Sequence, residues 1–423
     1  MSVRRSHPIE LPVAITLVVV AVAATLWQIF VSDLIEVADG CGWDGAVYCD
    51  MARNSVVMEP YSRRVLLPGV VSAFSGDDPV TGFRVVNALA CAALVAAAVW
   101  LYVRLSEGSA ESWACASVAA LVILNPWTVH LYLTYPVLTD FASAALITAW
   151  AATVLRGGRW DTLAGFALLV ALTLTREQWS LVAIGAAWLA VLLGLRRGRW
   201  ALGVTLVGSA GLAFTFTRTT SQPAGPLRAV YEFWLSESLT SSEHLARLSF
   251  MVAGGLGIVS LLLVMRPQLV LRSRPVLWVC LVALANTIIS VFAGGDTDRI
   301  LMPSGILLLC AATACATRDV FLRPAWCLLA LATVVTWHPF VTAGPDAASW
   351  LSFYGLRVTP LATVMDRVTS DAAVAGPLIL AAVLSARLGS GAGWPGRPRS
   401  TGPDVTQPTP EDSLVPGSRQ VAG

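Results

Sequence analysis

The chain has 423 residues, of which 56% are hydrophobic and 13% are charged, and its mean hydropathy is +0.70. These values exclude a soluble domain and indicate a membrane protein with several spans. The net charge is only +2, which gives no reason to expect a nucleic-acid partner.

Apolar segments follow one another along most of the chain. They predict an all-α polytopic membrane fold of about twelve helices, several of them shorter than a bilayer usually requires. No small-residue cleavage site follows the first segment, so we expect it to remain as a membrane helix. The expected spans are Leu11–Val31, Val85–Leu105, Trp113–Trp127, Thr139–Leu155, Trp160–Leu174, Trp179–Leu195, Trp200–Phe216, Phe250–Met265, Val276–Phe292, Ile300–Ala316, Trp326–Val341 and Ala372–Leu388.

The arginines predict how these helices are oriented. Every basic residue of the chain is arginine, and most of them fall in alternate connections between the expected spans. By the positive-inside rule those connections and both termini are cytoplasmic, as in a multi-pass protein of a bacterial plasma membrane. The opposite, outer side receives the loops 32–84, 218–247 and 344–371. We expect a transmembrane domain over 1–388, and a disordered cytoplasmic tail over 389–423 because that segment is too polar to bury itself.

The first loop, 32–84, is rich in carboxylates, arginines and aromatic rings. If Asp44–Ala52 is helical, a step of about 100° per residue places Tyr48 on the face of Asp44 and turns Asp50 away, toward Arg53. Asp44 is therefore the preferred reactive carboxylate and Asp50 the second candidate. The alternative for both is a loop that is simply acidic.

Two other features of this loop bear on its structure. Cys41 and Cys49 flank Asp44, and they either form a disulfide, if the loop faces an oxidising compartment, or remain two unpaired thiols. Arg63 and Arg64 precede the apolar stretch Val65–Phe74, which is too short to span but suits the membrane interface. Arginines in this place fit either a phosphate or lipid headgroups.

The pattern Asp-Gly-x-x-Tyr-x-x-Met-Ala, followed by Pro-Tyr-x-x-Arg-x-Leu-x-Pro, resembles the first outer loop of polytopic glycosyltransferases of the GT-C superfamily, the bacterial relatives of dolichyl-phosphate-mannose mannosyltransferases. Three later patches resemble the same group, and the likeness covers roughly the first 300 residues. The matching residues are Asp44, Gly45, Tyr48, Met51, Ala52, Pro60, Tyr61, Arg64, Leu66 and Pro68, with the patches Pro136–Asp140, Thr175–Glu177 and Gly295–Arg299.

The resemblance implies a transferase that passes a sugar from a polyprenyl-phosphate carrier to a glycan, lipid or protein acceptor at the outer face, with inversion. It implies short interfacial helices in the first loop and a base at Asp44. The cofactor question stays open, because acidic pairs could hold a divalent cation but lack a decisive spacing. The implied substrate-binding residues are Tyr48, Asp50, Tyr61, Arg64, Asp140, Arg176, Glu177, Asp296, Asp298 and Arg299.

The later patches also have structural explanations. Asp140 begins a helix whose N-terminal dipole favours a carboxylate. Arg176 and Glu177 fit an ordinary membrane interface, and Asp296 and Asp298 fit a turn.

Three other functions compete with the transferase. About twelve helices with both termini inside also suit a two-bundle transporter, although no half-to-half repeat is visible. A ligase or polymerase that moves a glycan from a lipid diphosphate would use a similar outer site. A structural or assembly role would need no reactive residue.

Overall fold

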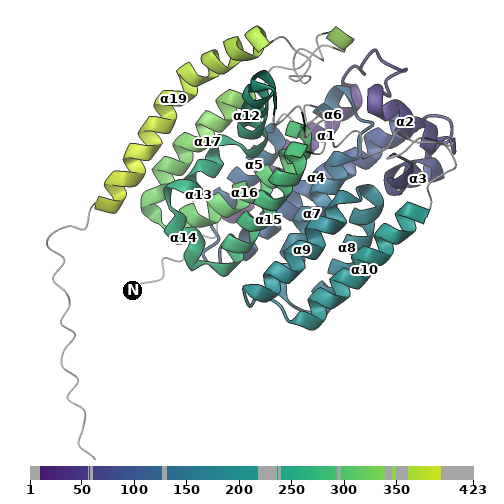
Figure 1. Ribbon diagram of the computed structural model, residues 1–423. Coiled ribbons are helices and arrows are strands. Elements are labelled where there is room, and N and C mark those ends of the chain that lie inside the picture. The colour runs from purple at the N-terminus through teal and green to yellow at the C-terminus, as the bar shows by residue number, and fades with distance from the viewer. Residues whose placement is uncertain are drawn as a thin grey trace, which may run out of the picture.

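The computed structural model describes residues 10–55, 57, 61–125, 131–217, 236, 240–292, 297–338, 345–348 and 361–391. Their regular structure is entirely helical, with no strand, as the sequence predicts (Figure 1). The α-helices and the short 3₁₀ helices (η) are α1 Glu10–Val31, α2 Trp43–Ala52, η1 Tyr61–Arg63, α3 Leu66–Phe74, α4 Pro79–Leu105, α5 Ser112–Leu124, α6 Leu131–Thr134, α7 Asp140–Arg156, α8 Arg159–Thr175, α9 Gln178–Leu192, α10 Gly198–Thr217, α12 Ser242–Leu256, η3 Ile258–Ser260, α13 Leu261–Met265, α14 Pro267–Arg272, α15 Arg274–Phe292, α16 Thr297–Arg318, η4 Val320–Leu322, α17 Arg323–Trp337 and α19 Leu361–Gly391.

The core of the bundle lies around α16, α4 and α7. The apolar stretch of α16 is 94% buried by the protein, whereas that of α19 is only 17% buried, so α16 is central and α19 is peripheral. Helices α8 to α10 pack together on one side of α7, and α12 to α17 gather on the other side (Figure 1). The buried residues are mainly Ala, Val and Leu, which let the helices approach closely.

Four helical stretches among the described residues are long and apolar enough to cross a membrane. They are Pro79–Leu105, Ile300–Arg318, Val320–Trp337 and Leu361–Leu388, and they indicate a membrane protein. Shorter apolar stretches are Val22–Val31, Ser112–Leu124, Gln178–Leu192 and Arg274–Ser290. The predicted total of about twelve spans stays a prediction, since four stretches meet this length.

Three helices differ from their predicted ranges by more than a few residues. The span expected over Phe250–Met265 is interrupted at Gly257, which has a φ of 73° and so ends α12 in a conformation that favours glycine. Helix α4 begins at Pro79, six positions before the expected Val85, because the side chain of Asp78 accepts a hydrogen bond from the Thr81 amide (3.1 Å) and caps the helix. Helix α19 begins at Leu361, within the segment expected to be a loop.

The first loop contains the short helices α2, η1 and α3. Helices α2 and α3 contact each other, and α3 packs on the start of α4 (Figure 1). At Gly82 of α4, an added Cβ would lie 2.7 Å from Val71 of α3, so the two helices meet at a glycine. This end of the bundle, which also carries the connections before α7 and α9, is hereafter the loop end. The predicted tail, 389–423, lies largely outside the described residues.

Helix α16 approaches α12 so closely that a side chain at Gly305 does not fit. An added Cβ would lie 2.2 Å from the carbonyl oxygen of Gly255. We therefore expect Gly305→Ala to destabilise the protein by about 1–3 kcal/mol through overpacking, measured by thermal unfolding in detergent. The matched control is Gly185→Ala in α9, where an added Cβ meets nothing within 4 Å. Equal stability of the two variants would contradict the close contact.

Candidate active site

Helix α2 is joined to the turn before it by a disulfide and to a distant segment by a tyrosine. Cys41 and Cys49 form the disulfide, which decides between the two states that the sequence left open. The amide of Gly45 donates a hydrogen bond to the hydroxyl of Tyr135 (2.8 Å), and the ring of Tyr135 occupies the space where a Cβ on Gly42 would lie. Gly42 also has a φ of 72°, which glycine adopts without strain. The start of α2 is therefore held in a fixed position.

Asp44 lies in the first turn of α2 and is half-buried. Its Oδ1 accepts a hydrogen bond from the hydroxyl of Tyr61 at 2.8 Å. Tyr48, one helical turn later, is buried, and its ring meets the ring of Tyr61 edge to face with centroids 5.5 Å apart. Asp44 and Tyr48 thus share a face, as the helical spacing predicts.

Asp50 lies on the other side of α2. Its side chain is 57% exposed and pairs with Arg53 at 3.7 Å. The structure therefore does not bring Asp50 to the face that carries Asp44. Asp50 instead forms an exposed pair with Arg53, the side of the helix that the helical spacing predicts for it.

Arg64 connects this face of α2 to the connection between α8 and α9. Its Nη1 donates to the hydroxyl of Tyr48 (2.8 Å), and its Nε lies 3.5 Å from Oε2 of Glu177. The guanidinium also lies over the ring of Tyr61, 5.4 Å from the centroid. A carboxylate from α2 and a cation from the next segment are therefore separated by a single tyrosine side chain.

The charges in this cluster shift the pKa values of its members. Burial, followed by the charge and the hydrogen bond of Asp44, raises the pKa of Tyr61, so the phenol stays protonated and remains a donor. Burial by itself would lower the pKa of Arg64, but Tyr48 and Glu177 raise it above its ordinary value. Burial would likewise raise the pKa of Glu177, but the charges of Arg64, Arg176 and Arg63 and a backbone hydrogen bond together outweigh burial and hold that pKa below its ordinary value.

Arg176 and Asp140 form a buried ion pair beside this cluster. Nη1 of Arg176 contacts Oδ1 of Asp140, and both side chains are at most 5% exposed. The N-cap residue of α7 is Thr139, and no side-chain hydrogen bond caps this helix end. Asp140, in the first turn of α7, pairs with an arginine, so its role is not limited to a favourable interaction with the helix dipole. The Nε of Arg176 is buried and has no hydrogen-bond partner among the described residues.

Other predicted residues lie outside what the structure describes. Asp296 and Pro60 are not among the described residues, and the side chains of Asp298 and Arg299, in the first turn of α16, are likewise outside them. Residues 218–235, 237–239, 344 and 349–360 of the other two expected outer loops are also outside. No group of three or more His, Cys, Asp or Glu that could hold a metal ion occurs in the described part of the chain.

Two residues of this site are not among the substrate-binding residues implied by the resemblance, although Arg63 was considered together with Arg64. Tyr135 holds the start of α2, and Arg63, in η1, is buried beside Arg64 in the chain. The adjacent arginines were a signal for Arg63. No spacing rule connects Tyr135 with Gly45, because 90 positions separate them.

Comparison with known proteins identifies no relative: no family model, curated protein or solved structure matches the chain. The chemistry of the site therefore has to be inferred from its own geometry. It offers a fixed, half-buried carboxylate, a neutral phenol that donates to it, a guanidinium over the ring of that phenol, and a second guanidinium in a buried ion pair.

The buried ion pair between Arg176 and Asp140 leads to a prediction about stability. Asp140→Ala should destabilise the protein by about 3–5 kcal/mol, because it leaves the charge of Arg176 buried without its partner. The double variant Asp140→Leu/Arg176→Met should recover most of that loss. Thermal unfolding of the single and double variants measures the coupling. Arg53→Ala, which breaks an exposed pair, is the control and should cost less than about 1 kcal/mol. A double variant as unstable as the single one would contradict the pairing.

The lowered pKa of Glu177 leads to a prediction about how stability depends on pH. Because its folded-state pKa lies below its ordinary value of 4.5, Glu177 contributes stability that is complete above about pH 4.5 and is lost as the pH falls through the folded pKa. Glu177→Gln should therefore lower the melting temperature at neutral pH and weaken its dependence on pH in acid. Melting curves from pH 7 to pH 3 measure both effects, with Asp50→Asn as the exposed control. A variant that keeps the full acid dependence would remove Glu177 as its source.

Proposed function

We propose that the protein is a membrane glycosyltransferase that moves a sugar from a polyprenyl-phosphate donor to an acceptor at the outer membrane face, with inversion and with Asp44 as general base. The observation that carries the proposal is the chain of contacts from Asp44 through Tyr61 to buried Arg64. A carboxylate and a buried cation so placed can serve the two ends of one transfer reaction. The resemblance of the first loop to GT-C enzymes supports the same assignment.

The acceptor end of the reaction needs a base. A hydroxyl is a weak nucleophile near neutral pH, and a positioned carboxylate that accepts its proton accelerates attack by about 10²–10⁴-fold. In the proposed step the acceptor oxygen bonds to the anomeric carbon, its proton passes to Asp44, and the bond to the carrier phosphate breaks. Tyr61 donates to one oxygen of Asp44 and so orients the carboxylate.

The donor end needs cations that stabilise the departing phosphate. Arg64 stays charged although its side chain is only 12% exposed, and its planar fork suits two phosphate oxygens. Arg176 offers a buried Nε that lacks a hydrogen-bond partner among the described residues. Because Asp140 holds its Nη1, Arg176 is suited to supporting the phosphate site from a fixed position. Glu177 holds Arg64 in the same way.

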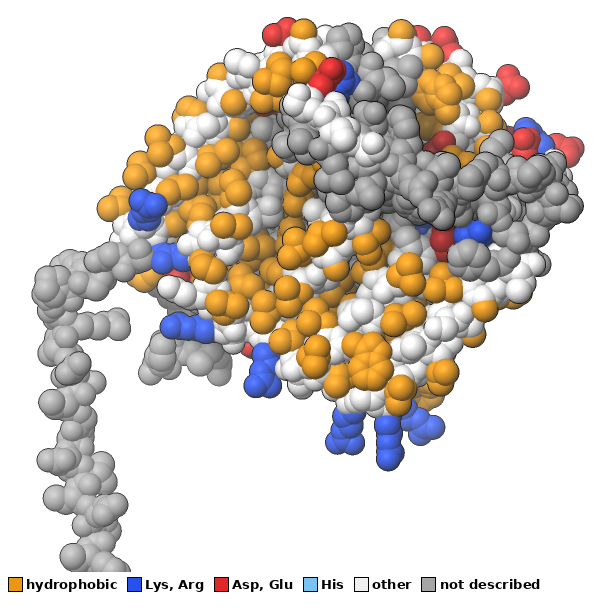
Figure 2. All heavy atoms as spheres, viewed as in Figure 1, with side chains coloured by type: hydrophobic (Ala, Val, Ile, Leu, Met, Phe, Trp, Pro, Cys, Tyr) orange, Lys and Arg blue, Asp and Glu red, His pale blue; other side chains and the backbone are white. Residues whose placement is uncertain are grey.

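The distribution of charge supports the proposed orientation in the membrane. On the face shown in Figure 2, most of the visible arginines lie at one end of the molecule, hereafter the arginine end, and most of the visible carboxylates lie toward the opposite end. At the arginine end, Arg318 pairs with Glu107, which joins the connection after α16 to the connection after α4. The positive-inside rule makes this end cytoplasmic and the loop end external. Both termini inside and about twelve spans, some of them short, are part of the proposal.

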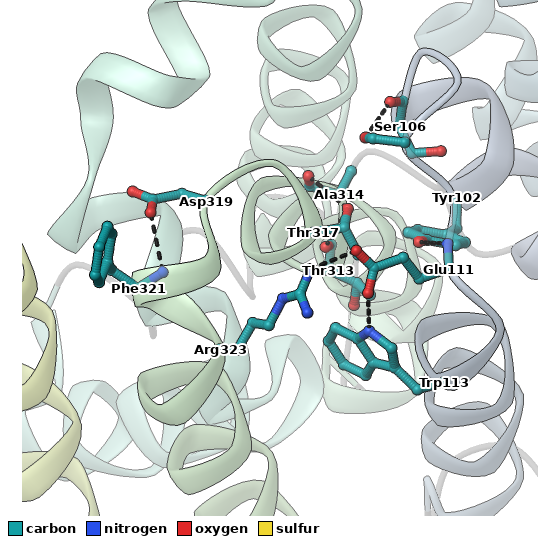
Figure 3. Close-up of polar contacts among 11 residues, drawn as sticks. Tyr102, Ser106, Glu111, Trp113, Thr313, Ala314, Thr317, Asp319, Phe321 and Arg323 are labelled. Carbon is teal, nitrogen blue, oxygen red and sulfur yellow. Dashed lines mark hydrogen bonds and ion pairs between the residues drawn. The ribbon is translucent and has the colours of Figure 1, made fainter. Parts of the chain in front are cut away.

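A second pair joins the same connections. Arg323 at the start of α17 contacts the carboxylate of Glu111, which also accepts a hydrogen bond from Trp113, and the three side chains point toward one another (Figure 3). The backbone amide of Glu111 donates to Tyr102 (3.0 Å). This end is thus closed by structural pairs, which supports placing the reaction at the other end.

The test is a transfer assay with Asp44→Asn. Membrane vesicles that contain the protein are supplied with radiolabelled polyprenyl-phosphate hexoses and pentoses, and the release of polyprenyl phosphate is measured. We expect Asp44→Asn to lose at least about 100-fold in rate, because the amide cannot accept the proton. The protein should still insert and unfold at nearly the same temperature.

Asp50→Asn is the matched control, because Asp50 belongs to the same helix but is solvated. It should keep nearly the full rate. Turnover by Asp44→Asn at the rate of the unmodified protein would remove Asp44 as the base. Accumulation of labelled sugar inside the vesicles without release of the carrier would instead favour a transporter.

A further inference from the structure

Two short connections lie side by side at the arginine end, one between α7 and α8 and the other between α9 and α10. Arg196, which precedes α10, donates from its Nε and Nη2 to the carbonyl oxygens of Val154 (2.7 Å) and Thr153 (2.6 Å) in the last turn of α7. Its guanidinium also lies over the ring of Trp200, 5.1 Å from the centroid. Arg196 therefore joins the two connections.

Positive charge collects around this junction. One carboxylate, that of Asp161 in the first turn of α8, belongs to the same region, and it is already used by the protein. It pairs with Arg156 (3.4 Å) and accepts a hydrogen bond from the amide of Gly158 (3.0 Å). The arginines of the two connections and of the adjoining helix ends are Arg156, Arg159, Arg196, Arg197 and Arg199.

Three of these arginines, Arg159, Arg197 and Arg199, are exposed and form no ion pair with a carboxylate of the described residues. We call these three residues the arginine face. Figure 2 shows arginine side chains that project from the molecule at the lower ends of α9 and α10. Arg159 and Arg199 lie in the first turns of α8 and α10, where the helix dipole disfavours a cation. Stabilisation of these helices therefore does not explain the two arginines.

Arginines elsewhere at this end are compensated within the protein. Arg318 pairs with Glu107 (3.1 Å), and Arg323 contacts the carboxylate of Glu111. Beside the arginine face the charge instead increases, because Arg274 at the start of α15 approaches Gly194 of the α9–α10 connection, where an added Cβ would lie 3.2 Å from its Nη1. This uneven distribution indicates a partner for the arginine face outside the protein.

Large apolar side chains border the arginine face. Trp160, which follows Arg159 in the chain, is 79% exposed, and Leu192 at the end of α9 is 83% exposed. Leu163, one turn after Arg159, is 52% exposed. In a membrane protein an exposed tryptophan ring favours the headgroup region, and exposed leucines face hydrocarbon. The arginine face therefore lies where the apolar surface ends. A lipid covers both kinds of side chain, whereas a soluble nucleic acid or acidic protein does not contact the apolar ones.

We propose that the arginine face binds the headgroups of anionic phospholipids, whose acyl chains cover Trp160, Leu163 and Leu192. The planar fork of a guanidinium bonds two phosphate oxygens at once. Three cations without a carboxylate partner favour a headgroup of net negative charge over a zwitterionic one. The arginine end is cytoplasmic by the positive-inside rule, and the anionic lipids of that leaflet attract basic segments beside membrane helices.

Such lipids hold the side of the bundle formed by α8 to α10 at a fixed depth in the membrane. Helices α8 and α9 continue from this end to the connection that carries Arg176 and Glu177 at the loop end. The lipid surface uses no residue of the candidate active site. It therefore exists whether or not the proposed transfer reaction is correct.

The experiment places the purified full-length protein in phosphatidylcholine bilayers that contain brominated phosphatidylglycerol or brominated phosphatidylcholine, whose bromines quench nearby tryptophans. The part of the quenching that disappears in Trp160→Phe reports the lipid beside the arginine face. We expect phosphatidylglycerol to be preferred there by at least about tenfold, because each arginine contributes roughly fivefold. Arg159→Gln/Arg197→Gln/Arg199→Gln should reduce the preference to about twofold or less. The corresponding triple lysine variant keeps the charge and should retain most of the preference.

Arg323→Gln is the matched control, because Arg323 lies at the same end but is already paired with Glu111. It should leave the preference beside Trp160 unchanged. An equal loss in Arg323→Gln would show a general attraction to the charge of this end and overturn the proposal. Equal quenching of the unmodified protein by the two brominated lipids would also overturn it and leave a soluble anionic macromolecule as the partner. If the triple glutamine variant does not insert, Arg197→Gln and Arg199→Gln decide, each with an expected loss of about fivefold.

Discussion

The guanidinium of Arg64 is the group on which the loop end depends. It contacts Tyr48 of α2, the ring of Tyr61 in η1 and Glu177 before α9, so the first loop and the distant connection between α8 and α9 meet at one charge. A buried cation is tolerated only where acceptors surround it, because its desolvation is costly. The need to satisfy Arg64 therefore determines where Tyr48, Tyr61 and Glu177 lie. Through Tyr61 it also determines the setting of Asp44.

The same requirement explains the second buried pair. Arg176 directly precedes Glu177 in the chain, but Arg176 pairs with Asp140 at the start of α7 whereas Glu177 pairs with Arg64. Two opposite pairs placed together leave little net charge inside the protein. They also leave the buried Nε of Arg176 without a hydrogen-bond partner among the described residues. A site assembled in this way is rigid and polar, although the surrounding bundle consists mainly of alanine and leucine.

The two ends of the bundle use charge differently. At the loop end, aromatic rings and carboxylates enclose the arginines, and the cluster sits beside helices too short to span. At the arginine end, several arginines pair with carboxylates or cap backbone carbonyls, as Arg318 does with Glu107 and Arg266 does with Ala386. Enclosed arginines suit a reaction that develops negative charge. Arginines at helix ends suit anchoring in a membrane that carries anionic headgroups.

Much of the helical architecture follows from the sequence. Apolar runs define helices such as α7 to α10 to within a few residues, and the helical step places Asp44 and Tyr48 on one face, because both depend only on neighbouring residues. Only the tertiary structure decided that Cys41 pairs with Cys49, that Tyr135 holds Gly45, and that Arg64 and Arg176 choose different carboxylates. These pairings depend on which distant segments lie next to one another and on which carboxylates can neutralise each buried arginine. The local spacing of residues along the chain gives no information on either point.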